Sequence, residues 1–162
     1  MSRFVSDTIR APLLAVRSLG TVSEVGSVGV GMTIPDEYTD LLDKRVFWHV
    51  ATLGPDGVIQ SSPVWGGFQD GHFVFSLTKG RQKLENLERN PTIAVSGIDP
   101  ENPYRYLEIR GKVVRVADDS SNEFIDSMAK KYMDADSYPF HQPGDQRVVM
   151  HVEPEHTTQM GN

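Results

Sequence analysis

Apolar residues recur along the chain in short runs separated by turn residues, and this spacing predicts strands. Residues 46–53 are almost all apolar, β-branched or aromatic, which is typical of a strand covered on both faces. The following Gly-Pro-Asp-Gly, at 54–57, predicts a tight turn because proline fixes one backbone angle and glycine accepts the left-handed conformation. Further strands are predicted over residues 58–65, 72–77, 92–98, 104–116 (bent at Gly111) and 146–152, with glycines at 66–67 and Asp70-Gly71 flanking the second reversal.

Helical spacing of apolar residues occurs in two or three places between these runs. Residues 79–90 place Leu84 and Leu87 on one side, and Pro91 ends the segment. Asp-Asp-Ser-Ser at 118–121 supplies capping side chains for a helix with an apolar stripe from Phe124 to Tyr132, and residues 34–43 predict a short helix. The pattern predicts a mainly β fold, an antiparallel barrel or sheet with two or three helices at its margin.

Residues 1–31 differ from the rest of the chain. They are rich in Ser, Gly and Val and have few large apolar side chains, so they cannot bury enough surface to offset the entropy of ordering. The apolar stretch at 11–16 is too short for the core of a signal peptide. We therefore expect residues 1–31 to be a poorly ordered extension outside the fold, and residues 32–162 to form one domain.

Composition excludes several classes of function. With no cysteine in 162 residues, disulfide scaffolds, thiolate metal sites and thiol nucleophiles are excluded, and a reducing, cytoplasmic location is favoured. A net charge of -6 argues against binding to the phosphate backbone of nucleic acids, which needs clustered positive charge. No apolar run is long enough to cross a bilayer, so we expect neither a nucleic acid nor a membrane as partner.

The usual catalytic motifs are missing from the sequence. There is no nucleophile elbow and no P-loop, and the glycines at 26, 29 and 31 have neither a strand before them nor a helix after them. The five histidines lack the spacing of metal ligands. We therefore predict no metal site and nominate no catalytic side chain.

One cluster of charge is unfavourable for folding alone. Lys79, Arg81 and Lys83 lie in or just before the first turn of the predicted helix, where cations meet the positive end of the helix dipole. Free backbone N–H groups and clustered cations together form an anion site, most naturally for a phosphate, and Gly80 lets the backbone approach it closely. The alternative is a solvated cationic turn that happens to fall at a helix start.

Two neighbouring stretches extend this candidate site. Residues 60–65 present amide, hydroxyl and indole groups along one strand, and Ser76, Leu77 and Thr78 run directly into the cationic turn. A phosphate site beside such a strand suits a flat, phosphorylated aromatic cofactor. The alternatives are core packing for Trp65 and a polar edge-strand face for Ser61 and Ser62.

The order of several segments resembles a known family. These are A-T-L-G-P-D-G (51–57), S-S-P-V-W (61–65), F-V-F-S-L-T-K-G-R-Q-K-L-E-N-L-E-R-N-P (73–91), L-E-I-R-G-K-V (107–113) and R-V-V-M-H-V-E-P (147–154). They resemble the pyridoxamine-phosphate-oxidase-like flavin and deazaflavin reductases, and most closely the branch that uses coenzyme F-420. The C-terminal region distinctive of the true pyridoxamine phosphate oxidases has no counterpart here, which argues against oxidation of vitamin B6.

The resemblance implies an antiparallel six-stranded split β-barrel that forms a homodimer with two cofactor sites at its interface. By position, Arg81 and Lys83 hold the cofactor phosphate. The other implied cofactor-binding residues lie on the strand bordering the ring, on the strand end and turn around the phosphate, and on the following helix: Gln60, Ser61, Ser62, Pro63, Val64, Trp65, Ser76, Leu77, Thr78, Lys79, Gly80 and Asn86.

The resemblance also implies the reaction. The ring system of the cofactor carries the hydride, and the protein holds it against a conjugated small molecule. We therefore expect an F-420-dependent oxidoreductase. The alternatives are an FMN-dependent oxidase or reductase on the same fold, and a non-catalytic carrier of a flavin or deazaflavin.

Overall fold

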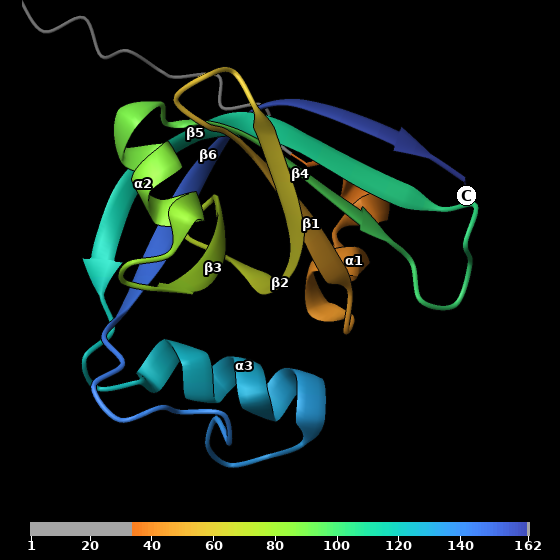
Figure 1. Cartoon of the computed structure of the whole chain (residues 1–162). Helices are drawn as coiled ribbons and strands as arrows, with labels where there is room; N and C mark the ends of the chain where they lie inside the picture. Colours follow the sequence, from red (N-terminus) through yellow and green to blue (C-terminus); the bar gives the residue numbers. More distant parts are fainter. Residues whose placement is uncertain (1–33, 162) are drawn as a thin grey trace, which may run out of the picture.

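Six antiparallel strands close into a barrel in the computed structural model, which describes residues 34–161 (Figure 1). Around the barrel the order is β1-β2-β3-β6-β5-β4, and β4 closes onto β1. This confirms the predicted mainly β split barrel, for which two or three helices are expected at the margin; residues 34–161 form three α-helices and one 3-10 helix. The expectation for residues 1–31 lies outside the described residues. The strands are β1 (Phe47–Leu53), β2 (Ile59–Gln69), β3 (His72–Thr78), β4 (Thr92–Ile98), β5 (Tyr106–Asp118) and β6 (Arg147–Met160), and the helices are η1 (Asp36–Tyr38), α1 (Asp40–Asp43), α2 (Gln82–Arg89) and α3 (Glu123–Met133).

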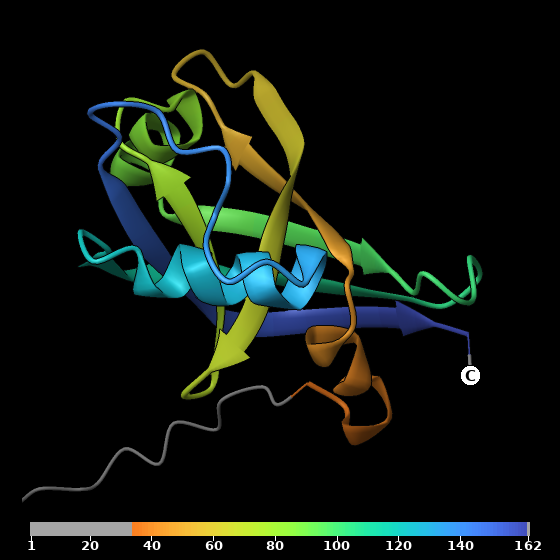
Figure 2. The ribbon, with the colours of Figure 1, turned by 90° about the horizontal axis from the view of Figure 1, so that it is seen from below.

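The barrel interior holds the main hydrophobic core. Trp48, Phe73 and Phe75 are fully buried there, and the ring of Trp48 meets that of Phe73 edge-on with centroids 5.2 Å apart. A second cluster lies outside the barrel, where α3 packs on the outer sides of β3 and β6. Figure 2 shows α3 crossing one side of the barrel.

The strand β1 is covered on one face only in the single chain. Trp48 and Val50 are fully buried, whereas Phe47 is 59% exposed and Leu53 is 39% exposed. The prediction that this run is covered on both faces is therefore wrong for the isolated chain. Its outward apolar face is left without a cover among the described residues.

Three element boundaries differ from the sequence predictions. The glycines at 66–67 lie inside β2 and not at a turn. Close packing requires glycine at 66, because a Cβ there would come within 2.5 Å of the Phe73 ring. The strand β6 runs on to Met160, since its polar second half pairs with β5. Residues 34–43 form η1 and the single turn α1 instead of one helix.

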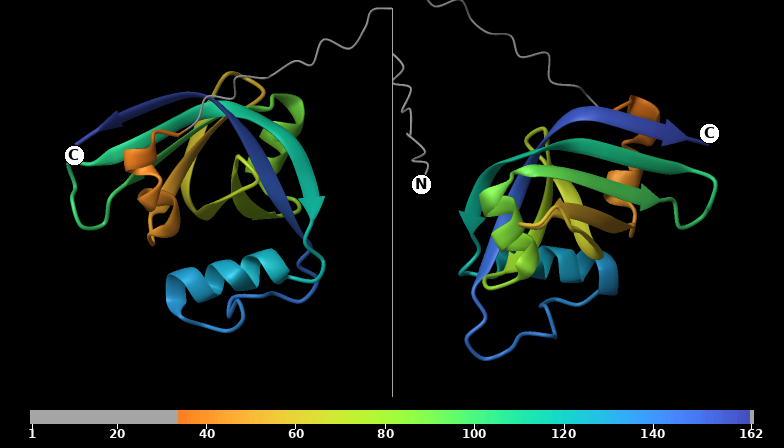
Figure 3. Two further views of the ribbon diagram at one scale, coloured as in Figure 1. Left: turned by 180° about the vertical axis from the view of Figure 1, so that it is seen from behind. Right: turned by 45° about the horizontal axis from the view of Figure 1, so that its top comes forward.

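The strands β5 and β6 are long and extend beyond the other strands (Figure 3). Their pairing shifts register between Arg110 and Gly111, as the predicted bend requires. A Cβ at Gly111 would lie 2.0 Å from the carbonyl oxygen of Glu153, so only glycine permits this approach.

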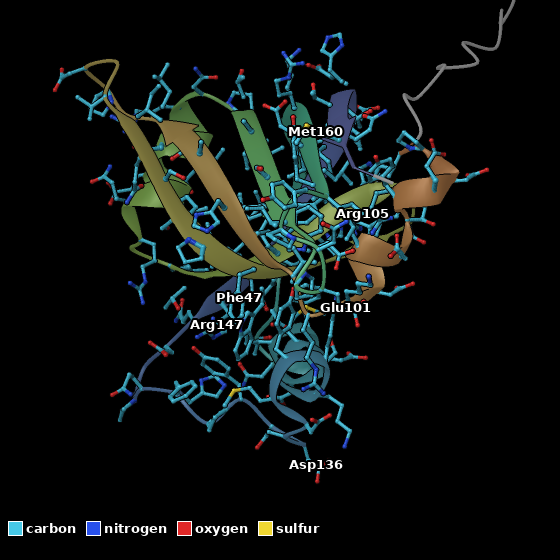
Figure 4. The ribbon with its side chains drawn as sticks, turned by 90° about the vertical axis from the view of Figure 1, so that its right-hand side faces the viewer. Phe47, Glu101, Arg105, Asp136, Arg147 and Met160 are labelled. Atoms are coloured by element: carbon cyan, nitrogen blue, oxygen red, sulfur yellow. The ribbon has the colours of Figure 1, made fainter. Side chains whose placement is uncertain are left out.

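An ionic network fastens α1 to the loop between β4 and β5 (Figure 4). The buried Asp99 accepts bonds from Lys44 Nζ at 2.9 Å and Arg105 Nη1 at 2.8 Å. Burial by itself raises the pKa of Asp99, but the bonds donated by the Glu101 amide, Lys44 and Arg105 outweigh burial and hold the pKa at about 2.

The depressed pKa of Asp99 makes part of the stability depend on pH. The contribution is present above pH ~4, the ordinary range of an aspartate, and is lost as the pH falls toward the folded pKa of about 2. We expect Asp99→Asn to lower Tm at pH 7 by about 3–6 °C. Calorimetry should show this difference shrinking below pH ~4; a constant difference at every pH would contradict the ionic role.

Candidate functional site

The barrel is split between β2 and β3. These strands pair only from Gly66–Phe75 to Gln69–His72; before Gly66, β2 stays with β1, and after Phe75, β3 stays with β6. A cavity of about 510 Å³ lies at this split and is lined by both strands. Its volume is within the range usual for small-molecule sites.

Most of the residues implied by the resemblance meet at this cavity. Residues from β2 and from the end of β3 face one another across the split, and the start of α2 closes one end. The lining includes, from that set, Gln60, Ser62, Pro63, Val64, Trp65, Ser76, Leu77, Thr78, Arg81 and Lys83.

Lys83 is the most unusual of these residues. It is only 5% exposed, and its ammonium group donates to Ser62 Oγ at 2.6 Å and approaches the Val50 carbonyl oxygen at 3.5 Å. Burial lowers its pKa below the ordinary range of lysine. No carboxylate in residues 34–161 forms an ion pair with it, so an anion entering the cavity would find a desolvated positive charge.

The start of α2 adds backbone donors beside Lys83. The helix begins at Gln82, with Arg81 as an extended N-cap residue, and not at residue 79. Gly80 has φ of +83°, a conformation that favours glycine and turns the chain out of β3 into the helix. The first amides of a helix have no acceptor within it, so this end can bind an anion.

The charges of the cavity contrast with those of the whole chain. Arg81, Lys83 and Arg147 line it, and no Asp or Glu does. A second cavity, of about 550 Å³, is lined by Asp43, Asp70 and Glu153 and by no Lys or Arg. In a chain of net charge -6, the first cavity is therefore the one suited to an anionic ligand.

Aromatic rings form another part of the cavity wall. Trp65 stacks on Tyr132 with ring centroids 5.2 Å apart and planes at 7°, and it meets Tyr138 edge-on at 5.7 Å. Trp65 is thus fixed by packing against α3 while it also lines the cavity. The packing interpretation of this residue is confirmed, and its cofactor-binding role stays a prediction.

Four of the implied residues do not line the cavity. Ser61 is exposed on the outward face of β2, and Gly80 forms the turn. Lys79, 49% exposed in its side chain, approaches Asp118 at 3.9 Å and continues the pairing of β3 with β6. The buried Asn86 amide bonds Thr52 and Gln60, so it holds α2 against the barrel.

The cavity also has walls that the sequence did not indicate. Phe47 comes from β1, Gln82 from α2, and Ile125, Tyr138 and Arg147 from α3, its following loop and β6. One signal in the sequence marks Arg147: it is a charged residue that directly precedes the apolar residues 148–150. Nothing in the local sequence of Tyr138 marks it, because its position depends on how the loop folds back.

Metal and membrane features are both missing from the described part of the chain. No group of His, Cys, Asp or Glu side chains in residues 34–161 could hold a metal ion. Over the same residues, none of the helices has the length and apolar character that a bilayer crossing needs.

Comparison with known proteins gives matches of two kinds. A family model described as pyridoxamine 5'-phosphate oxidase matches residues 34–161. Among solved structures, a protein named F-420 reductase is 35% identical, with a TM-score of 0.69 over 77% of this chain and 98% of its own. None of the curated proteins compared with the chain matches it.

More distant structures share the fold alone. A conserved hypothetical protein from Mycobacterium tuberculosis is 19% identical, with a TM-score of 0.61 over 81% of this chain and 87% of its own. General stress protein 26 from Bacillus anthracis is 17% identical, with a TM-score of 0.57 over 76% and 91%. The family match, which spans all of the described residues, shows that the chain belongs to the pyridoxamine 5'-phosphate oxidase family.

Proposed function

We propose that this protein is an oxidoreductase that transfers a hydride between coenzyme F-420 and a conjugated small molecule. One observation carries the proposal: the buried Lys83 has no anionic partner among residues 34–161 and lines a cavity free of acids. The family assignment supports an oxidoreductase, and the 35% identical F-420 reductase supports the deazaflavin as cofactor.

The residues at the split fit a phosphorylated ring. Lys83 and Arg81 would hold the phosphate by charge-assisted hydrogen bonds, and the amides at the start of α2 would add neutral donors. The hydroxyl of Ser62 fixes the Lys83 ammonium at 2.6 Å. When bound, the deazaflavin supplies the hydride chemistry.

The remaining walls would position the ring and exclude water. Val64, Trp65 and Leu77 give the cavity apolar walls. A flat ring packed against them would exclude water from its face. The gap between β2 and β3 leaves two strand edges without a ladder partner, and their amide and carbonyl groups can meet polar edges of a ring. Orientation of this kind supplies much of the acceleration of a hydride transfer.

We also propose that the protein is a homodimer with the cavity at its interface. The outward face of β1, β2 and β4 is apolar and exposed: Phe47 is 59%, Ile59 is 71% and Ile98 is 55% exposed. Phe47, Pro63 and Trp65 belong to this face and also line the cavity. A second copy seated here would cover β1 on both faces, as its largely apolar and β-branched sequence favours.

A titration of the purified protein with F-420 and FMN side by side tests the proposed function. We expect F-420 to bind more tightly, and the reduced coenzyme to lose its hydride to a member of a panel of conjugated acceptors, followed by absorbance. Tight FMN binding with turnover would favour the flavin alternative, and binding without transfer to any acceptor would favour a carrier. Binding of neither cofactor would refute the proposed function.

A further inference from the structure

Arg147 is a second buried cation of the cavity, and it has almost no partners. It is 8% exposed, and among residues 34–161 it forms no ion pair. Its Nη1 donates to Ser76 Oγ at 3.5 Å, the limit of a hydrogen bond, and its buried Nε has no partner at all. A guanidinium carries five donors and stays charged in proteins, so most of this group's bonding capacity is unused.

The position of the guanidinium is nevertheless well defined. Its Cζ lies 4.5 Å from the centre of the Tyr138 ring, a cation–π contact, and the Tyr138 amide donates to Asp126 Oδ1 at 2.7 Å. The Tyr138 ring in turn meets Trp65 edge-on. Stacking covers one face of the guanidinium and leaves its planar edge free. This edge is the part that forms bidentate hydrogen bonds with a carboxylate or a phosphate.

Arg147 and Lys83 belong to different sides of the split. Lys83 contacts Ser62 on β2, whereas Arg147 lies beside Thr78 in the pairing of β6 with β3 and contacts Ser76. Figure 4 shows Arg147 between the barrel and α3, on the same side as Phe47. Arg81 and Lys83 can therefore hold one phosphate at the start of α2 while Arg147 remains available to another group.

A buried charge without a counter-charge is costly, and no carboxylate in residues 34–161 pairs with this one. An anionic group that enters the cavity can supply the acceptor that it lacks. We propose that Arg147 binds a second anionic group, a carboxylate or phosphate separate from the phosphate at Arg81 and Lys83. This inference rests on the proposed function, because it concerns the same cavity, and it predicts that the substrate or the acidic tail of the cofactor carries that group.

Matched pairs of ligands distinguish these two sources. The substrate pair is cinnamate and methyl cinnamate, which differ in charge but share a conjugated body. The cofactor pair is F-420 and its deazaflavin riboside phosphate, which keeps the phosphate and lacks the tail. Calorimetric titrations with the wild type, Arg147→Gln and Arg147→Lys measure every affinity without turnover.

If the substrate supplies the anion, Arg147→Gln weakens cinnamate about tenfold or more and leaves methyl cinnamate within about twofold. If the cofactor tail supplies it, the same variant weakens F-420 about tenfold or more but not the riboside phosphate. Arg147→Lys, which keeps the charge and loses the planar fork, should lie between the wild type and the Gln variant. Either pattern supports the proposal.

Arg45→Gln is the matched control, because Arg45 is exposed, pairs with Asp134 at 2.6 Å and lies outside the cavity. The proposal is overturned if the effect of Arg147→Gln differs between the two members of each pair no more than the effect of this control does. It is also overturned if the wild type shows no preference for the more anionic member of either pair. A selective loss of cinnamate in a protein that binds no deazaflavin would support Arg147 and refute the proposed cofactor, so the two failures are distinguishable.

Discussion

Replacing Arg81 and Lys83 together by alanine weakens F-420 or FMN binding about a hundredfold or more in a calorimetric titration. Each side chain is assigned a charge-assisted bond to the phosphate, and such bonds are worth more than neutral ones when water is excluded. Lys83 contributes more of this loss, because its ammonium is already desolvated and held by Ser62. Riboflavin, which lacks the phosphate, should lose little affinity.

Lys79→Ala is the matched control for this experiment. Lys79 is two residues before Arg81 and carries the same charge as Lys83, yet it does not line the cavity and approaches Asp118 instead. It should bind the cofactors like the wild type. Equal losses in the control and in the double variant would show that general positive charge, and not a built phosphate site, attracts the ligand.

A further variant separates the phosphate site from folding. Lys83→Met removes an unpaired buried charge and keeps an unbranched side chain only one heavy atom shorter, so the empty protein should melt at the same or a higher temperature. Lower cofactor affinity together with unreduced stability is the signature of a residue kept for its ligand. A variant that melts lower and binds normally would assign Lys83 to the fold.

The second large effect is expected at the outward face of β1. Ala51 lies opposite Ser61 on β2 and Ala94 on β4, at a point where small side chains leave room for another molecule. Ala51→Glu would place a charge inside the proposed interface, at a cost of several kcal/mol. We expect this variant to be a monomer by light scattering, where the wild type is expected to be a dimer. Its cofactor affinity should be about tenfold or more lower, because the proposed partner covers the cavity.

Gln69→Glu adds the same charge near the other end of β2, where the side chain is exposed. It should leave both the molecular mass and the cofactor affinity as in the wild type. A wild-type monomer that binds cofactor normally would contradict the interfacial site. An Ala51→Glu monomer that still binds would show that one chain suffices.

The strands could largely be predicted because alternation and turn residues act locally. Gly54 to Gly57 and Asp70-Gly71 mark two reversals, and the apolar runs between them became β1, β2 and β3. The second half of β6 could not be found, since it is polar and pairs with β5 through backbone bonds that leave no apolar pattern. The prediction that Gly66 flanks a reversal is wrong, because a glycine that permits close packing looks the same in sequence as one that permits a turn.

The cavity was only partly predictable for a related reason. The cations at 79–83 stand out against the helix dipole, and two of them, Arg81 and Lys83, line the cavity. The third, Lys79, does not, because its amide still pairs with the Gln146 carbonyl and the helix begins only at Gln82. Arg147 and Tyr138 are distant in sequence from that turn. The register of β6 against β3 brings Arg147 there, and the folding of the loop after α3 brings Tyr138 there.

The strands β2 and β3 are hydrogen-bonded to each other over only part of their length. Backbone bonding fastens the two strands at one end only, and the rest of their length is left for a ligand to bridge. A ligand bound in that gap would stabilise the association of the two strands. The protein with the ligand bound would then be more rigid there than the empty protein.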